Sequence, residues 1–232
     1  MPSKPVPRRV AAELVALVVL SAGCLFLFPR RSVLIDMGLA VLAIALIGLN
    51  ARYTRTVIWK AVPDQLEPNP WRSCVRLTLL VTALPVLMFL VVGSNLAYSS
   101  GGWLAVADRT LNSHMAIAFT LYLPWALVQQ VLFQFYLLGR LRTLLLGSHP
   151  ILPCTINAVV FGAVHIPDVG TIVVSAVGGV AWSLLYLRYR LLLPLAVSHA
   201  ALGTTLYYWI YGRDLAIHWI ESLDSLSLPW AD

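Results

Sequence analysis

Long apolar runs separated by short polar segments dominate the hydrophobic pattern of this chain. Seven runs are candidate membrane spans, and they cover about residues 10–28, 32–50, 75–95, 113–138, 150–166, 170–187 and 191–211. A helix of about 20 apolar residues crosses the hydrocarbon core of a bilayer. The pattern therefore predicts an all-α, polytopic integral membrane helix bundle with about seven transmembrane helices. The fifth and sixth spans are the weakest, because Pro167 and Gly170 crowd the link between them.

The polar segments divide the chain into three parts. We expect N-terminal transmembrane helices and loops over residues 1–112, a transmembrane core over 113–211, and a C-terminal tail over 212–232. The Ser- and Gly-containing segment 96–112 is expected to be a loop. Ser21-Ala-Gly-Cys24 in the first run weakly resembles a lipoprotein cleavage box, but the run stays apolar through Phe28, which favours a retained helix over a cleaved signal.

Composition agrees with a membrane setting. The chain is 59% hydrophobic and only 11% charged, against roughly 25% charged residues in soluble domains. The three cysteines suggest neither a disulfide framework nor a metal-binding spacing. With a cytoplasmic N-terminus, twelve of the sixteen Lys and Arg residues fall on the cytoplasmic side. We therefore expect membrane lipids and no nucleic acid as partners, a bacterial inner (plasma) membrane as the location, and a C-terminus outside.

Three amides interrupt one apolar run, WALVQQVLFQFYLLGRLR over residues 125–142. Gln130 and Gln134 are four residues apart and share one face of a helix, whereas Gln129 lies about 100° away. A lipid-facing amide costs roughly several kcal/mol, so this face should point into the bundle. The glutamines either tie neighbouring helices together by hydrogen bonds or line a functional site, and the run itself leaves both interpretations open.

Two histidines lie within later spans. They are His165, in the fifth, and His199, in the seventh. Each is either a hydrogen-bonded packing residue or part of a functional site, and ionisable groups inside a span are functional candidates because they are costly to hold in lipid. His149 in a loop, His218 in the tail and His114 at a helix start are weaker candidates.

The order and spacing of these residues resemble those of a known family, the CAAX proteases and bacteriocin-processing enzymes (CPBP family), which are related to the type II CAAX prenyl endopeptidase. Its members carry Glu-Glu-x-x-x-Arg on one helix, Phe-x-x-x-His on a second, and His-x-x-x-Asn (or Asp) on a third. Here the matching positions hold Gln129-Gln130-x-x-x-Gln134, Phe161-x-x-x-His165 and His199-x-x-x-Gly203. The resemblance covers residues 113–211, and it implies an intramembrane protease core.

The resemblance also implies candidate catalytic residues, which are Gln129, Gln130, Gln134, His165 and His199. In the family's proposed mechanism the motif glutamate activates a water molecule, and histidines orient that water or stabilise the oxyanion. Glutamine cannot accept the proton, so it cannot be the general base. The family arginine and the final asparagine are also replaced, by Gln134 and Gly203. The first motif has therefore lost both acids and their basic partner together.

If hydrolysis is retained, another residue must act as the base. His165 and His199 are the first candidates, because an imidazole titrates near neutrality. Asp168 is the nearby carboxylate, and its simpler interpretation is a solvated loop acid beside Pro167. A divalent metal held by His165 and His199 is conceivable but lacks a third ligand at a suitable depth.

Three functions remain open. The first is an intramembrane endopeptidase that hydrolyses a peptide bond at a membrane-embedded polar site, with a transmembrane or lipidated peptide or protein segment among the candidate substrates. The second is a catalytically silent relative that binds a membrane segment or a partner. The third is a bis-histidine haem protein or a small-solute transporter. Haem would require His165 and His199 to face each other, and transport favours broken-helix repeats in two halves, which the sequence lacks.

Overall fold

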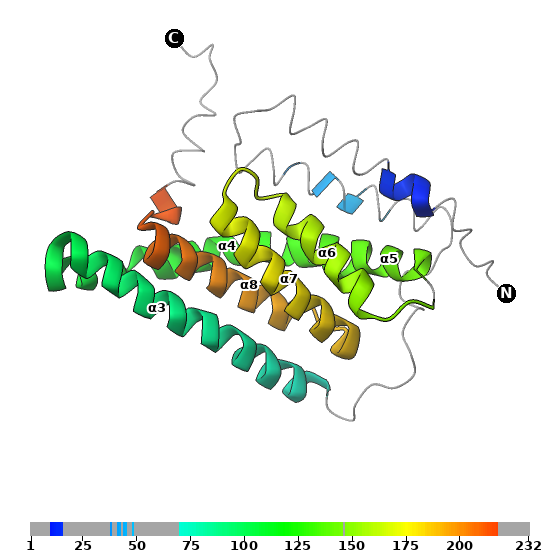
Figure 1. Ribbon diagram of the computed structural model, residues 1–232, viewed down its shortest axis with the longest axis horizontal. Coiled ribbons are helices and arrows are strands. Elements are labelled where there is room, and N and C mark those ends of the chain that lie inside the picture. The colour runs from blue at the N-terminus through cyan, green and yellow to red at the C-terminus, as the bar shows by residue number, and fades with distance from the viewer. Residues whose placement is uncertain are drawn as a thin grey trace, which may run out of the picture. The chain divides into compact units, whose positions relative to one another are not determined.

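The computed structural model describes residues 10–15, 38, 41–42, 44–45, 48, 70–145 and 147–217. Every regular element in the described part of the chain is helical (Figure 1). The elements from residue 70 onward are α3 (Pro70–Thr110), α4 (His114–Gln130), the π-helix η2 (Val131–Leu137), α5 (Leu138–Leu144), α6 (Ile151–Ala163), α7 (Val169–Tyr189), α8 (Leu193–Thr205) and the π-helix η3 (Leu206–Tyr211).

The chain forms two compact units. Unit 1 comprises residues 1–70 and 129–192, and unit 2 comprises residues 71–128 and 193–232. Unit 1 therefore contains η2, α5, α6 and α7, whereas unit 2 contains α3, most of α4, α8 and η3.

Within unit 1, α6 and α7 pack closely along much of their length (Figure 1). Glycines permit this approach. A Cβ added at Gly179 would lie 3.0 Å from the Cα atom of Ala158, and one at Gly162 would lie 2.8 Å from the carbonyl oxygen of Ile172. Small residues at membrane helix interfaces let backbones approach in this way.

Within unit 2, α3 packs against α8 and η3. The hydroxyl groups of Thr82 and Ser198 are 2.6 Å apart and join α3 to α8. Further along α3, Gly93 lies against the backbone of Trp209 in η3, where any side chain would collide. One buried hydrogen bond therefore holds α3 beside α8, and one close backbone contact holds it beside η3.

The predicted loop over residues 96–112 is mostly wrong, because α3 continues to Thr110. The hydroxyls of Ser99 and Ser100 each donate to a carbonyl of their own helix at 2.8 Å, so these polar side chains do not end it. The helical geometry breaks only at Gly101 and Gly102. Gly102 has φ 68° and ψ −155°, a conformation that is essentially confined to glycine.

Three described helices are long and apolar enough to cross a membrane, and they cover Trp71–Thr110, His114–Leu144 and Val169–Tyr189. The all-α membrane bundle is thus confirmed in the described residues. The first two predicted spans lie mostly outside those residues. The predicted span 150–166 is reduced to α6, which has 13 residues and a length of about 20 Å, short of the roughly 30 Å hydrocarbon core.

Candidate functional site

The three glutamines lie where α4 changes into a π-helix. Gln129 and Gln130 are the last residues of α4, and Gln134 lies in the middle of η2. Their exposed fractions are 7%, 1% and 1%. The prediction that the glutamine face points inward is therefore confirmed, and Gln129 is buried as well.

The π-helix gives a physical reason for the burial of Gln129. A π-helix pairs residues i and i+5 and so holds more residues per turn than an α-helix. Gln129 precedes Gln134 by five residues. Its side chain therefore lies closer in direction to that of Gln134 than it would in a regular α-helix. Segments of π-helix are frequent at functional sites, but the sequence carried no signal for this one.

Gln134 is the centre of a buried hydrogen-bond network in unit 1. Its Oε1 accepts hydrogen bonds from Asn157 Nδ2 at 3.2 Å and from Ser183 Oγ at 2.9 Å. Asn157 Nδ2 also donates to Ser183 Oγ at 2.9 Å. The three side chains come from η2, α6 and α7, so one uncharged network joins three helices.

Several atoms of this region have hydrogen-bonding capacity that the described residues do not use. Gln134 Nε2, Asn157 Oδ1 and Gln129 Oε1 are buried without a hydrogen-bond partner among those residues. A buried donor or acceptor left unpaired costs about 1–3 kcal/mol. The region therefore offers one donor and two acceptors to a neutral polar group.

Sequence reasoning missed Asn157 and Ser183. Each is fully buried, and each lies in a predominantly apolar helix, α6 or α7. Their polarity was the available signal, because an amide or hydroxyl inside a membrane helix can hydrogen-bond across to another helix.

His165 lies just beyond the end of α6 in unit 1. Its Nδ1 is 3.0 Å from the carbonyl oxygen of Phe161, and its ring packs edge-on against that of Phe161 at 5.5 Å. Donation from Nδ1 makes Nε2 the lone-pair nitrogen of the neutral ring. The two residues of the second motif are therefore in contact, and their contact fixes the tautomer of the histidine.

Asp168 is the N-cap residue of α7. Its carboxylate accepts a hydrogen bond from the backbone N–H of Thr171 at 3.0 Å and so caps the helix N-terminus. The interpretation of Asp168 as a solvated loop acid is therefore incomplete, because the side chain is half-buried and engaged in capping.

His199 lies in unit 2, where it is 4% exposed. Its Nε2 is 3.3 Å from the hydroxyl of Tyr122 on α4, and the two rings meet edge to face at 5.6 Å. A Cβ added at Gly203 would lie 2.5 Å from Cε1 of Tyr122. Tyr122 thus occupies the space next to position 203, where the family carries an asparagine. The sequence alone gave no signal for Tyr122, because an aromatic residue in an apolar helix is most simply read as core.

The candidate residues are therefore divided between the units. The glutamines and His165 belong to unit 1, and His199 belongs to unit 2, so the single catalytic site that the resemblance implies for these residues stays a prediction. Within the described residues, no group of three His, Cys, Asp or Glu side chains could hold a metal ion. The metal site at His165 and His199 also stays a prediction.

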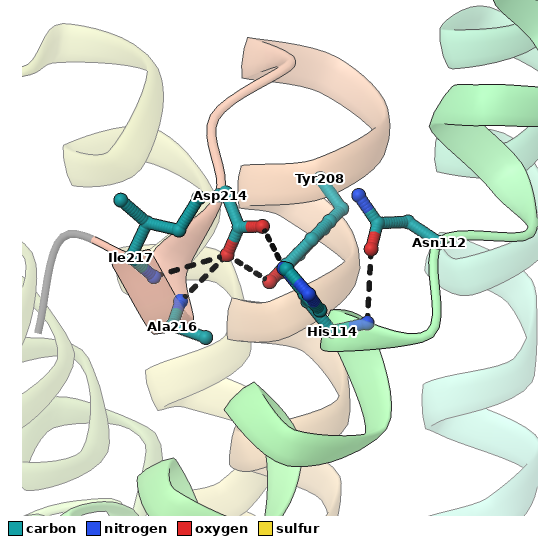
Figure 2. Close-up of polar contacts among 6 residues, drawn as sticks. All are labelled: Asn112, His114, Tyr208, Asp214, Ala216 and Ile217. Atoms are coloured by element: carbon teal, nitrogen blue, oxygen red, sulfur yellow. Dashed lines mark hydrogen bonds and ion pairs between the residues drawn. The ribbon is translucent and has the colours of Figure 1, made fainter. Parts of the chain in front are cut away.

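A second polar cluster surrounds Asp214, after η3 in unit 2 (Figure 2). One carboxylate oxygen lies 2.8 Å from His114 Nδ1, and the other accepts the Tyr208 hydroxyl at 2.5 Å and the Ala216 N–H at 2.9 Å. Partial burial raises the pKa of Asp214, but the hydrogen bonds from Tyr208, His114 and the backbone outweigh it, so the pKa lies below its ordinary value. The cluster fastens the start of α4 to the segment after η3.

Residues 111–205 match a family model described as Type II CAAX prenyl endopeptidase Rce1-like. The match covers less than half of the chain, but it includes all three motifs, and it confirms the resemblance drawn from them. No curated protein and no solved structure matches the chain. Together with the long apolar helices, the family match defines a CAAX-protease-like integral membrane protein.

Proposed function

We propose that this protein binds a polypeptide segment inside the membrane at a site formed by Gln129, Gln134 and Asn157, and that it does not hydrolyse this segment by the glutamate mechanism. The observation that carries the proposal is the network of Gln134, Asn157 and Ser183. This network surrounds the last position of the first motif, Gln134, and none of its three side chains is ionisable. Among the described residues, the buried polar side chains are amides, hydroxyls and one imidazole. None of the amides or hydroxyls can act as a general base near neutral pH.

The chemistry of the unused atoms supports a peptide group as the ligand. An ionised ligand would be desolvated here without a counter-charge, which is costly. A peptide group is neutral and offers one N–H and one C=O, which complement the acceptors of Gln129 and Asn157 and the donor of Gln134 that have no partner among the described residues. An intact transmembrane helix has already paired these backbone groups. The ligand is therefore a membrane segment that is unwound at the point of contact.

Binding of a labelled peptide tests the proposal. The probe is a hydrophobic transmembrane peptide with a central Gly-Pro pair, and its matched partner carries Leu-Ala there. We expect the full-length protein in detergent to prefer the Gly-Pro peptide. Gln134→Leu should weaken that preference about fivefold to thirtyfold, from about 1–2 kcal/mol per membrane hydrogen bond.

Thr155→Val is the control for this experiment, because Thr155 is exposed on α6 and, among the described residues, its hydroxyl bonds within its own helix. Equal binding of the two peptides, or unchanged binding in Gln134→Leu, would contradict backbone recognition. Release of a cleaved fragment from the bound peptide would contradict the non-hydrolytic part of the proposal.

The second candidate is the endopeptidase, and the pairing of His199 with Tyr122 favours it. A buried imidazole held by a hydroxyl can serve as a base. In that case His165→Ala and His199→Ala should each abolish processing of a substrate peptide, and Gln130→Ala should impair it strongly. For a silent binder, the same three changes should leave peptide binding largely intact and mainly lower the unfolding temperature.

We further propose that the N-terminus is cytoplasmic and that the protein resides in a bacterial inner membrane. The distribution of Lys and Arg residues between the predicted loops supports this orientation.

A further inference from the structure

Two arginines of unit 1 stand at the ends of membrane spans. Arg142 is in the last turn of α5, two residues before the end of the candidate span His114–Leu144. Arg190 directly follows α7, whose whole length, Val169–Tyr189, is a candidate span. A residue at the end of a span lies at the depth of the lipid headgroups.

The backbone conformation of Arg190 is unusual. It is the one described residue other than glycine with a positive φ, at 57°, a conformation that costs an L-residue energy and persists where the surroundings hold it. Its N–H donates to the carbonyl oxygen of Tyr186 at 2.9 Å, and its guanidinium lies over the Tyr186 ring, with Cζ 5.3 Å from the centroid. The chain after α7 therefore turns so that this guanidinium returns onto the helix.

The guanidinium of Arg190 has donors that the described residues do not use. Its Nε and one of its Nη atoms are buried and have no hydrogen-bond acceptor there. Neither Arg190 nor Arg142 forms an ion pair with a carboxylate in the described part of the chain, whereas Arg140 pairs with Glu13 at 2.9 Å. Burial lowers the pKa of Arg190, and the positive charge of Arg142 lowers it further against the opposing effect of Tyr186. Arg142 and Arg190, each at the end of a candidate span, thus have no anionic partner among the described residues.

We propose that Arg142 and Arg190 bind the phosphate of an anionic phospholipid. Guanidinium groups bind phosphate oxygens through paired N–H donors, and basic sites between transmembrane helices on the cytoplasmic side suit anionic headgroups. The headgroup is anionic, because the choline of a zwitterionic lipid would bring a third positive charge to the two arginines. The α5 and α7 ends thus form a lipid site that is separate from the glutamine network.

Native mass spectrometry of the full-length protein in detergent tests this site, with phosphatidylglycerol and phosphatidylcholine as probes. We expect tighter binding of phosphatidylglycerol, and a loss of about tenfold in affinity in Arg142→Gln, since a phosphate contact is a charge-assisted hydrogen bond as well as an ion pair. Arg142 lies inside a helix, so its substitution leaves the turn after α7 intact. Arg190→Gln should give a similar loss.

Arg188→Gln is the matched control, because it removes the same charge from an exposed position on α7 and should keep the affinity within about twofold of the parent, as expected for a surface charge. Wild-type affinity in Arg142→Gln would overturn the proposal, and so would an equal loss in Arg188→Gln, which would indicate diffuse attraction. Equal binding of the two lipids would refute the preference for an anionic headgroup. Displacement of phosphatidylglycerol by millimolar inorganic phosphate would assign the site to a free anion.

Discussion

Replacing Gly203 should disturb the pair of Tyr122 and His199. In Gly203→Ala the new Cβ would lie 2.5 Å from Cε1 of Tyr122, about 1 Å inside ordinary contact between carbon atoms. Overpacking of this kind costs about 1–3 kcal/mol, and the better helix propensity of alanine offsets about 0.5–1 kcal/mol of it. We therefore expect a net loss of up to about 2.5 kcal/mol in the free energy of unfolding.

Thermal unfolding in detergent, followed by circular dichroism, measures this change, and the chain supplies a control. Gly139→Ala adds the same methyl group in α5, where nothing lies within 4 Å, and it should be neutral or stabilising. A double-mutant cycle with Tyr122→Ala assigns the effect, because removal of the ring should cancel most of the cost at position 203.

The family asparagine provides the same test with a larger side chain. Gly203→Asn should be tolerated only with a small residue at position 122. If Gly203→Ala unfolds no earlier than Gly139→Ala, or if the cost persists in Tyr122→Ala, the steric reasoning is refuted.

Three further outcomes are expected. Ser183→Ala should lower the free energy of unfolding by about 1–3 kcal/mol, since it removes hydrogen bonds of Gln134 and Asn157, and an unchanged unfolding curve would contradict the network. The pKa of Asp214 is depressed in the folded protein, so its contribution to stability should be present above the unfolded pKa of about 3.9 and be lost as the pH falls below it. Asp214→Asn should remove this contribution from the pH dependence of the free energy of unfolding. A pH profile of stability like that of the wild type in this variant would argue against the role of Asp214. Reporter fusions in residues 51–73 and after residue 212 should report opposite sides of the membrane, and the same side for both would require an even number of spans.

The sequence predicted those features that depend on transfer into lipid. Apolar runs became helices because only an internally hydrogen-bonded backbone is stable there. The inward direction of the glutamines followed from the cost of a lipid-facing amide. The continuation of α3 through Ser99 and Ser100 escaped prediction, because their hydroxyls bond to carbonyls within the same helix, and so polarity did not mark a loop.

The partners of the candidate residues could not be predicted in the same way. Asn157 and Ser183 are 23 and 49 residues from Gln134, and a polar residue in an apolar helix carries no pattern that points to its partner. Tyr122 meets His199 across 77 residues for a packing reason, the absence of a side chain at position 203. These contacts depend on which helices are neighbours, and hydrophobicity does not encode that choice.

The π-helix between Val131 and Leu137 means that the number of residues between two motif positions does not give the angle between them. A π turn holds more residues than an α-helical turn, so deletion of one residue from this segment would allow an ordinary α-helix to form and would leave the helix beyond it facing nearly the same way. A deletion before Gln134 would place it four residues after Gln129, a spacing at which two side chains share one face of an α-helix. Among relatives, an insertion or deletion at this point can therefore be absorbed by a change of helix type, so two chains can present their motif residues to the same neighbours although the spacing between those residues differs.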